Sequence, residues 1–180
     1  MFVKNYYSLL NERLGGGYSY ENLPLMVYGG FNAPSLSSYS NFAIKTCLTS
    51  HINGSVLNNT SNSAPTPGVV FANGNVPVSI EDYKQSGDAL SNITVSCSVE
   101  VVSDAKGQTI TGNYTITNNA TEPQTIGEVC IFSGILYRVG SYNQGKYVMI
   151  ERTVLDSPVT IPAGGTGQVT YTIRLDYPTA

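Results

Sequence analysis

Strict alternation of apolar and polar side chains is the feature that most constrains this sequence. From Gln168 to Tyr177, every second residue is Val, Tyr, Ile, Leu or Tyr, and the residues between them are Gln, Thr, Arg and Asp. A period of two residues is that of a β-strand with one face buried and one face in solvent. Residues 92–102 alternate in the same way, and residues 110–116 repeat the pattern. These runs predict an all-β protein.

Turn sequences rich in Gly, Pro, Asn and Asp separate the runs, at residues 103–107, 118–123 and 162–167. Proline fixes φ and lacks an N–H donor, and glycine permits positive φ, so each type ends a strand. Residues 125–139 form a denser apolar run that predicts one central strand or two. Further strand candidates are residues 42–50, 69–71, 76–80, 147–154 and 159–161.

Together these segments give about eight strands spaced about ten residues apart, which is the pattern of a β-sandwich. We therefore expect an antiparallel sandwich, immunoglobulin-like or jelly-roll in type, over residues 41–180. Residues 159–177 are expected to form either a hairpin or two successive strands of that sandwich. Residues 51–68 are polar and contain two prolines, and this predicts a long loop.

The N-terminal part has a different pattern. Apolar residues at positions 3, 7, 10 and 14 predict a short amphipathic helix over residues 2–14, ended by three consecutive glycines. Residues 18–40 lack a sustained period and predict an extended arm, so the chain divides into residues 1–40 and 41–180. The helix is expected to dock either on its own domain or on a neighbouring subunit. The residues expected at an interface are Val3, Tyr7, Leu10, Leu14, Tyr18, Tyr20, Tyr28, Phe31 and Tyr39.

The surface is predicted to be polar but poor in charge. Charged residues make up 12% of the chain, against roughly 25% in an average soluble domain. Neutral amide and hydroxyl groups lose less free energy than charges when they are desolvated, so such a surface suits permanent assembly. It is equally typical of an extracellular β-protein that carries Thr and Ser on its strands.

Charge and apolar content also limit the partners. The net charge is −3 and no Lys/Arg cluster occurs, so neither nucleic acid nor an anionic membrane is an expected partner. The N-terminus lacks the apolar core and cleavage site of a signal peptide, and no segment reaches the ~18 apolar residues of a membrane span. Synthesis in the cytoplasm is expected. Cys47, Cys97 and Cys130 lack metal-site or redox spacing and are predicted to be buried free thiols, the alternative being one disulfide and one remaining thiol.

Sequence motifs for catalysis are lacking. His51 is the only histidine, and it stands in a predicted loop without a nucleophile motif. Glu81 and Asp82 form the only adjacent acidic pair, and no calcium-loop or phosphate-loop pattern occurs. We therefore expect no catalytic residues, no cofactor and no metal, and the chain is predicted not to be an enzyme. A glycan-cleaving enzyme would need two carboxylates about 5–10 Å apart in an open cleft.

Tyrosine is abundant: the chain holds 13 Tyr and no Trp. Tyrosine joins a large apolar ring to a hydroxyl tip, which suits subunit interfaces first, then strand faces, and then sugar-binding platforms. A glycan is therefore a weaker candidate partner than another protein subunit.

Two C-terminal segments carry a recurrent pattern: TIGEVCIFSG at residues 125–134 and VMIERTVLDSPVTIPAGGTGQVTYTI at residues 148–173. Over about the last 90 residues the chain resembles small structural proteins of tailed bacteriophages, in which an I-x-E-x-x-hydrophobic-Phe strand precedes an ERT segment and a vtYtI ending. The matching positions here are Ile126, Glu128, Phe132, Glu151, Arg152, Thr153 and Tyr171. The resemblance implies a β-sandwich building block of a virion in which none of these residues is catalytic.

The resulting expectation is a virion structural protein, as a head decoration, neck or tail component, made in the host cytoplasm. Its expected partners are copies of itself and other virion proteins. The alternative is a carbohydrate-binding β-sandwich at a fibre or surface that uses Tyr and Asn on loops such as residues 51–63. A glycan-cleaving enzyme is the third hypothesis.

Overall fold

Nearly all regular structure among the described residues is β-strand, as the alternating runs predict. The computed structural model describes residues 2, 26–27, 31–32, 36–39, 47–54, 57, 63, 65–139 and 141–177. Its strands are β1 (Met26–Val27), β2 (Phe31–Asn32), β3 (Leu36–Tyr39), β4 (Gly68–Ala72), β5 (Ile93–Ser103), β6 (Gly107–Asn118), β7 (Gln124–Val139), β8 (Tyr142–Ile161) and β9 (Thr166–Asp176).

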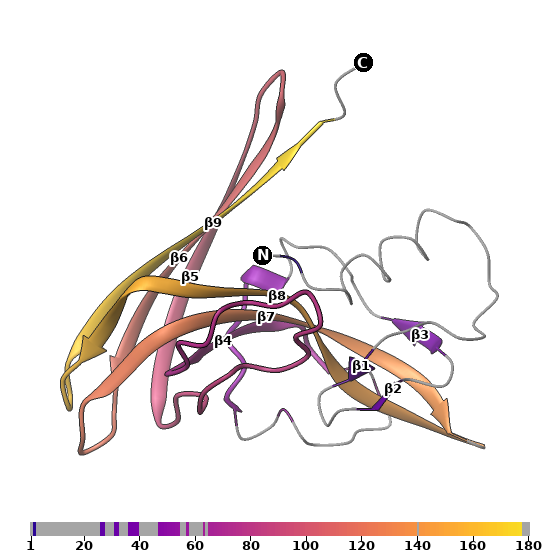
Figure 1. The fold of residues 1–180 in the computed structure, drawn as a ribbon, viewed down its shortest axis with the longest axis horizontal. Helices are drawn as coiled ribbons and strands as arrows, with labels where there is room; N and C mark the ends of the chain where they lie inside the picture. Colours follow the sequence, from indigo (N-terminus) through magenta and orange to yellow (C-terminus); the bar gives the residue numbers. More distant parts are fainter. Residues whose placement is uncertain are drawn as a thin grey trace.

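Two antiparallel sheets form the layers of a sandwich-like fold (Figure 1). The first sheet has the order β5-β6-β9. In the second sheet β7 is central: β8 pairs along one edge, and β4 and then β3 pair along the other. The expected count of about eight sandwich strands is not confirmed, because six strands of five or more residues build the two layers. The remaining strands, β1 to β3, have two to four residues each.

The β5-β6-β9 sheet has unbroken registers, with Ile93 to Ser103 opposite Asn118 to Gln108 and Gly107 to Thr117 opposite Asp176 to Thr166. Its alternating apolar residues point toward the second sheet, as the sequence predicts. There they join β4, β7 and β8 in the larger core cluster. The buried members from the first sheet are Ile110, Tyr114, Ile116, Val169, Tyr171 and Ile173.

The second sheet is buried on both of its faces. Val129, Ile131 and Val148 face the first sheet, whereas Cys130, Phe132 and Met149 belong to a smaller cluster on the opposite face, with Ile52 and Leu57. A strand covered on both sides has no polar face, which explains the dense apolar run at residues 125–139. That run forms one strand, β7, not two.

The chain passes from one layer to the other between β8 and β9. Gly164 adopts a positive φ of 68° in the turn at residues 162–165, where Gly165 N–H donates to the Pro162 carbonyl. The fully buried Asn118 at the end of β6 fixes this turn, because its side-chain amide donates to the carbonyls of Ile161 and Pro162. Residues 159–177 are therefore two successive strands in different sheets, since β9 pairs with β6.

Residues 47–52 form a strap that closes one side of the sandwich. The strap carbonyls of Leu48 and Thr49 accept hydrogen bonds from Tyr114 Oη and Cys97 Sγ of the first sheet, at 2.9 Å each. Ile52 N–H then donates to Val69 O of β4 at 2.8 Å. The strand expected at residues 42–50 is wrong for residues 47–50, where Cys47 and Leu48 are helical; residues 42–46 lie outside the described part.

A second expected strand, residues 76–80, is also wrong, because this segment is irregular. The alternation of Val76, Val78 and Ile80 resembles a strand, but Val76 and Ile80 are 54% and 51% exposed and do not enter either core. The carbonyls of Val76 and Pro77 instead accept hydrogen bonds from Arg152. A buried charge has therefore overridden the local pattern.

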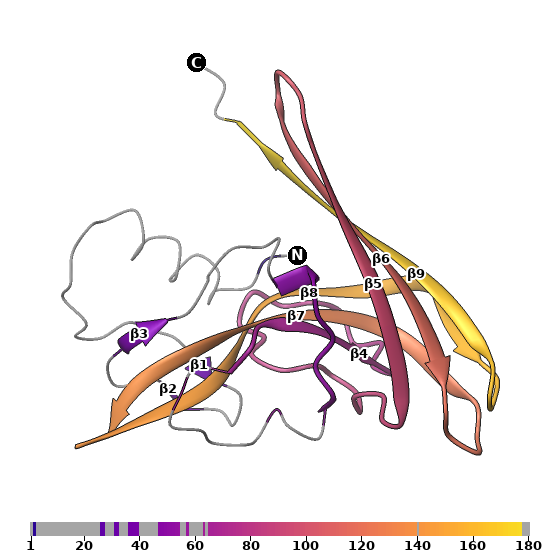
Figure 2. The same cartoon turned by 180° about the vertical axis from the view of Figure 1, so that it is seen from behind.

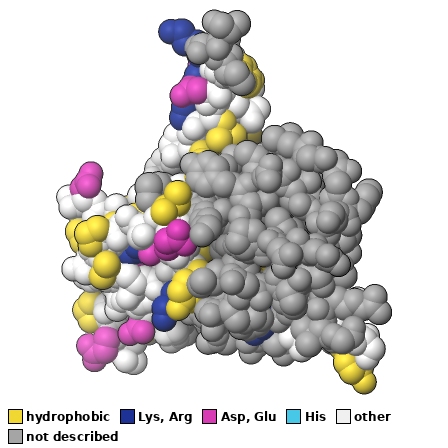
Figure 3. Space-filling view, turned by 45° about the vertical axis from the view of Figure 1, so that its right-hand side comes forward, with side chains coloured by type: hydrophobic (Ala, Val, Ile, Leu, Met, Phe, Trp, Pro, Cys, Tyr) yellow, Lys and Arg dark blue, Asp and Glu magenta, His cyan; other side chains and the backbone are white. Residues whose placement is uncertain are grey.

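The β5-β6-β9 sheet extends past the second sheet as a projecting blade, formed by residues 101–103, 107–109 and 174–176 and the turn between β5 and β6 (Figures 1 and 2). In the space-filling view the blade stands clear of the rest of the molecule (Figure 3). At its tip, Asp104 accepts hydrogen bonds from the backbone of Lys106 and Gly107 and from Arg174. This arrangement ties the β5–β6 turn to β9.

The helix predicted for residues 2–14 lies outside the described residues apart from Phe2, which forms an isolated antiparallel bridge with Glu151 of β8. Phe2 also packs against the larger core cluster, so at this residue the N-terminus docks on its own domain. Within the described residues no helix has the length and apolar character needed to cross a bilayer.

The strap makes stability sensitive to mild acid through His51. The ring stacks on Phe71 at 5.9 Å, and burial lowers the pKa of His51 from 6.5 to about 4. The unfolded chain therefore binds a proton between pH 6.5 and 4 that the folded chain excludes, so stability falls as pH decreases. Between pH 7 and pH 5 we expect a loss of about 1–2 kcal/mol. Urea denaturation at both pH values measures this loss. In the variant His51→Gln, the free energy of unfolding should change much less between pH 7 and pH 5 than in the wild type. An equal change in both proteins would show that His51 is not the group responsible.

Candidate functional site

The outer face of the β5-β6-β9 sheet is a regular surface formed by three long paired strands. It is dominated by threonine, and several of the hydroxyls meet across the strands: Thr117 Oγ1 lies 3.2 Å from Thr166 Oγ1, and Thr170 Oγ1 donates to Asn113 Oδ1 at 2.9 Å. Such cross-strand pairs stabilise the sheet. They also make most of this face polar without charge.

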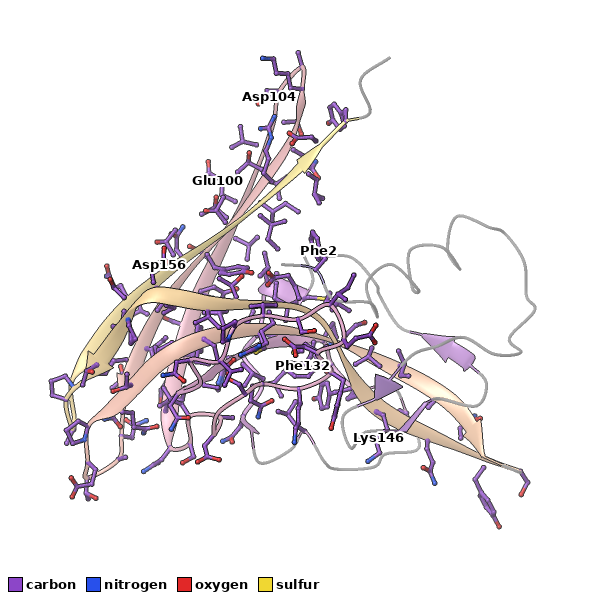
Figure 4. The ribbon with its side chains drawn as sticks, viewed as in Figure 1. Phe2, Glu100, Asp104, Phe132, Lys146 and Asp156 are labelled. Carbon is purple, nitrogen blue, oxygen red and sulfur yellow. The ribbon has the colours of Figure 1, made fainter. Side chains whose placement is uncertain are left out.

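Charge on this face is confined to Glu100, Arg174 and Asp176, all at or near the blade (Figure 4 labels Glu100 and Asp104). Arg174 pairs with Asp104 at 2.7 Å and with Asp176 at 2.9 Å. The hydrogen bonds from Arg174, together with the N–H groups of Lys106 and Gly107, hold the pKa of Asp104 well below its usual range. The surface between these charges and the turn at residues 162–165 is neutral.

A second arrangement of polar residues lies inside the protein, on the face of the second sheet that points away from β5-β6-β9. Arg152 of β8 is 1% exposed and its Nε donates to Glu128 Oε2 of β7 at 2.6 Å. Its Nη1 donates to Asp82 Oδ2 at 2.7 Å. Burial opposes the charge of Arg152, but hydrogen bonds to Asp82 and Glu128 outweigh this effect and raise its pKa.

Glu128 uses its remaining oxygen capacity to hold the loop at residues 76–88. Its Oε1 accepts the backbone N–H groups of Ser86 at 2.8 Å and Gly87 at 2.9 Å, and its Oε2 accepts the Ser86 hydroxyl at 3.1 Å. A side chain at Gly74 would collide with the Glu128 carboxylate and the Ser86 hydroxyl, so glycine is required there. We call Glu128, Arg152 and Asp82 the arginine clamp.

The arginine clamp brings two carboxylates together, as the active site of a glycosidase would require. In the clamp, however, the oxygens of Glu128 are occupied by hydrogen bonds. Glu128 is fully buried and accepts hydrogen bonds on both oxygens. A general acid needs a proton to give, and a nucleophile needs access to its substrate. Glu128 therefore anchors the loop and is shielded from any substrate. The Asp82 side chain is 23% exposed and, together with Tyr83 and Arg152, lines a small pocket of about 170 Å³.

A third polar group crosses the interface between the two sheets. A bulge at Ile131/Phe132 places Ile150 and Glu151 on the same inner side of β8. Glu151, 4% exposed, accepts hydrogen bonds from the Tyr171 hydroxyl of β9 and, at 2.8 Å, from Thr153. Burial, and then the charge of Glu151, raise the pKa of Tyr171 far above its ordinary value. This group joins the two layers by hydrogen bonds within an otherwise apolar core.

The expected interface residues are placed only in part. Phe31 lies in β2 and Tyr39 in β3, where it pairs with Ile135 of β7. Val3, Tyr7, Leu10, Leu14, Tyr18, Tyr20 and Tyr28 lie outside the described residues.

Cys47, Cys97 and Cys130 are free thiols as predicted, but only Cys47 and Cys130 are buried. The expected burial is wrong for Cys97, which lies on the edge strand β5 and is partly exposed. Burial raises the pKa of Cys47 to about 12 and that of Cys130 well above its ordinary value, so these two thiols are unreactive. Within the described residues, no group of three His, Cys, Asp or Glu side chains could hold a metal ion.

Comparison with protein-family models, curated proteins and solved structures finds no match to this chain. Its function is therefore inferred from its residues and their geometry.

The sequence did not predict the arginine clamp or the contact of Glu151 with Tyr171 and Thr153. It did single out Glu128, Glu151, Arg152, Thr153 and Tyr171 as positions of a recurrent pattern, and these residues supply most of the arginine clamp and the whole of the contact between layers. The available signal was a charged residue inside an apolar run, as at Glu128 in β7, since such residues are rarely buried without a partner. Asp82, which comes from an irregular loop, carried no such signal.

Removing the Arg152 charge should leave Glu128 buried without its counter-ion. For Arg152→Met we expect a loss of about 3 kcal/mol or more in the free energy of unfolding, because an unpaired buried charge is costly. The loop at residues 76–88 should also loosen, so trypsin should cut after Lys84 faster than in the wild type. Arg174→Met is the matched control, since Arg174 also contacts two carboxylates but is exposed; its effect on both measurements should be much smaller. Equal effects of the two substitutions would show that the buried pairs of Arg152 do not hold the loop at residues 76–88.

The contact between the layers is tested by Tyr171→Phe, which removes one hydroxyl and keeps the ring. We expect a loss of about 1–3 kcal/mol, because the buried Glu151 carboxylate loses a donor. Chemical denaturation measures it. Tyr177→Phe, at a half-exposed tyrosine just past the same strand, should be neutral, and a neutral Tyr171→Phe would show that Glu151 does not need this donor.

Proposed function

We propose that this protein is a structural component of a tailed-bacteriophage virion, as a head decoration, neck or tail protein, that acts through contacts between subunits. The observation that carries the proposal is the neutral, threonine-rich outer face of the β5-β6-β9 sheet. Burying hydroxyl and amide groups costs less free energy than burying charges, and these groups can pair with a neighbour across an interface. Such a surface suits a subunit that stays bound to its neighbours once the particle has assembled.

The buried polar groups support the same proposal. The residues that resemble the phage pattern, Glu128, Arg152 and Glu151 among them, are occupied with internal hydrogen bonds. They stabilise a two-layer body and leave its outer surface free for assembly. Phe2 and Leu36–Tyr39 contact the protein's own sheets, so the rest of the predicted N-terminal helix and arm is proposed as a second contact with a neighbouring subunit.

A carbohydrate-binding module is the second candidate. It is favoured by an open groove of about 680 Å³ whose lining includes Gly54, Asn73, Lys84, Ser86 and Asp88. Amide, hydroxyl and charged groups of this kind are suited to the hydroxyls of a sugar. The groove lies beside the loop held by the arginine clamp, so its shape depends on Glu128.

The virion proposal predicts that the protein co-purifies with particles at a fixed ratio to other structural proteins. Density-gradient purification followed by mass spectrometry measures this ratio, and cryo-EM of the same particles should locate the sandwich in a repeated position. A chain found only in the unassembled fraction would overturn the proposal. A glycan array probed with the purified protein tests the second candidate. A carbohydrate-binding module should bind selected glycans, and replacing Lys84 and Asn73 by Ala should abolish this binding.

A further inference from the structure

The edge of the β5-β6-β9 sheet at β5 is open. β5 pairs with β6 along all eleven of its residues, and no other described strand pairs with it. The backbone N–H and C=O groups on its outer edge are therefore available to another strand. Natural proteins usually protect such an edge with proline, lysine, a bulge or an inward-pointing charge. β5 has none of these, and Glu100 is its only charged residue.

The inner side of β5 is also incompletely covered. The inward-facing residues of the neighbouring strand β6, such as Ile110, Tyr114 and Ile116, are buried, with at most 3% exposure. By contrast, Ile93, Val95, Cys97, Val99 and Val101 of β5 are only partly buried against the same core. The apolar layer thus continues to the edge of the sheet and stops there. A further strand beside β5 would complete its burial.

We infer that β5 pairs antiparallel with β5 of a second copy of this chain, around a two-fold axis at Ser98, to form one continuous six-stranded sheet. The inference rests on the proposed function, because it names the partner for one contact of the assembly. Antiparallel pairing of a strand with itself is isologous, so a single surface serves both subunits. Centring the pair on Ser98 uses the full length of the strand.

The side chains of β5 are compatible with this register. On the outer face Ser98 meets Ser98, Ser96 meets Glu100 and Thr94 meets Val102, so Glu100 never faces another carboxylate. On the inner face Val95 meets Val101 and Cys97 meets Val99, which extends the apolar layer. A register centred on Glu100 would instead place two like charges opposite each other, which is unfavourable. The sequence of the edge thus favours self-pairing in one register.

Two lysine substitutions on the same strand test the register. Ser98→Lys places two lysines opposite each other at the axis and should weaken the dimer, whereas Ser96→Lys places each lysine opposite Glu100 of the second copy and should strengthen it. One Lys–Lys pair forms at the axis, but two Lys–Glu pairs form beside it. The dissociation constant should therefore rise roughly 1.4- to 5-fold for Ser98→Lys and fall roughly 2- to 30-fold for Ser96→Lys. Thr115→Lys, on the outer face of the central strand β6, adds the same charge away from the edge and should have little effect.

Sedimentation equilibrium at several concentrations measures the dissociation constants, and circular dichroism verifies that each variant is folded. As a second measurement, Ser98→Cys in a Cys97→Ala background should form a disulfide-linked dimer on mild oxidation, because residues that face each other at the axis lie roughly 4.5–5.5 Å apart at Cα. Thr115→Cys in the same background should not. A wild-type chain that is monomeric at every concentration, or equal shifts for the two lysine variants, would overturn the inference.

The outcomes distinguish the inference from the proposed function. If the lysine variants shift as stated but particles lack the protein, the pairing of β5 stands and the virion role is wrong. If particles contain the protein but its β5 edge contacts something other than β5, the virion role stands and the self-pairing is wrong.

Discussion

The buried charge of Arg152 is the constraint to which much of this structure is fitted. A guanidinium group removed from water must be surrounded by acceptors, and two segments of the chain provide them. Glu128 lies on the neighbouring strand, and the loop at residues 76–88 supplies the Asp82 carboxylate and the carbonyls of Val76 and Pro77. Because the requirement is strict, it determines where residues 76–88 run. It also explains why this segment, which alternates like a strand, does not join a sheet.

The interior and the outer face of the β5-β6-β9 sheet differ in the kind of polar side chain that they carry. Buried charges form the arginine clamp and the Glu151 group between the layers, while the outer face of β5-β6-β9 carries mainly threonine. Buried charges specify one arrangement of the layers, and neutral hydroxyls leave the outside open to a neighbour.

The sequence predicted those parts of the fold in which apolar and polar side chains alternate regularly. The alternation in β5, β6 and β9 predicted their inward faces correctly, and the turns at residues 103–107 and 162–167 were recognised from glycine and proline. Prediction was wrong at residues 47–50 and 76–80, where long-range hydrogen bonds to Tyr114, Cys97 and Arg152 determine the backbone. Local pattern contains no information about a partner that is dozens of residues away. For the same reason, the pairing of Asp82 with Arg152 could not have been anticipated.

The passage of the chain from β8 to β9 has a consequence for how the protein folds. β6 acquires its second neighbour only when β9 arrives, and Val169, Tyr171 and Ile173 of that strand fill the space between the layers. A nascent chain that ends before β9 would thus expose the apolar sides of both sheets, together with the unprotected edge of β5. Non-local pairing of this kind is slow, and its intermediates aggregate readily. The stage before β9 joins the sheet is therefore the one at which the apolar inner faces of both layers are least covered.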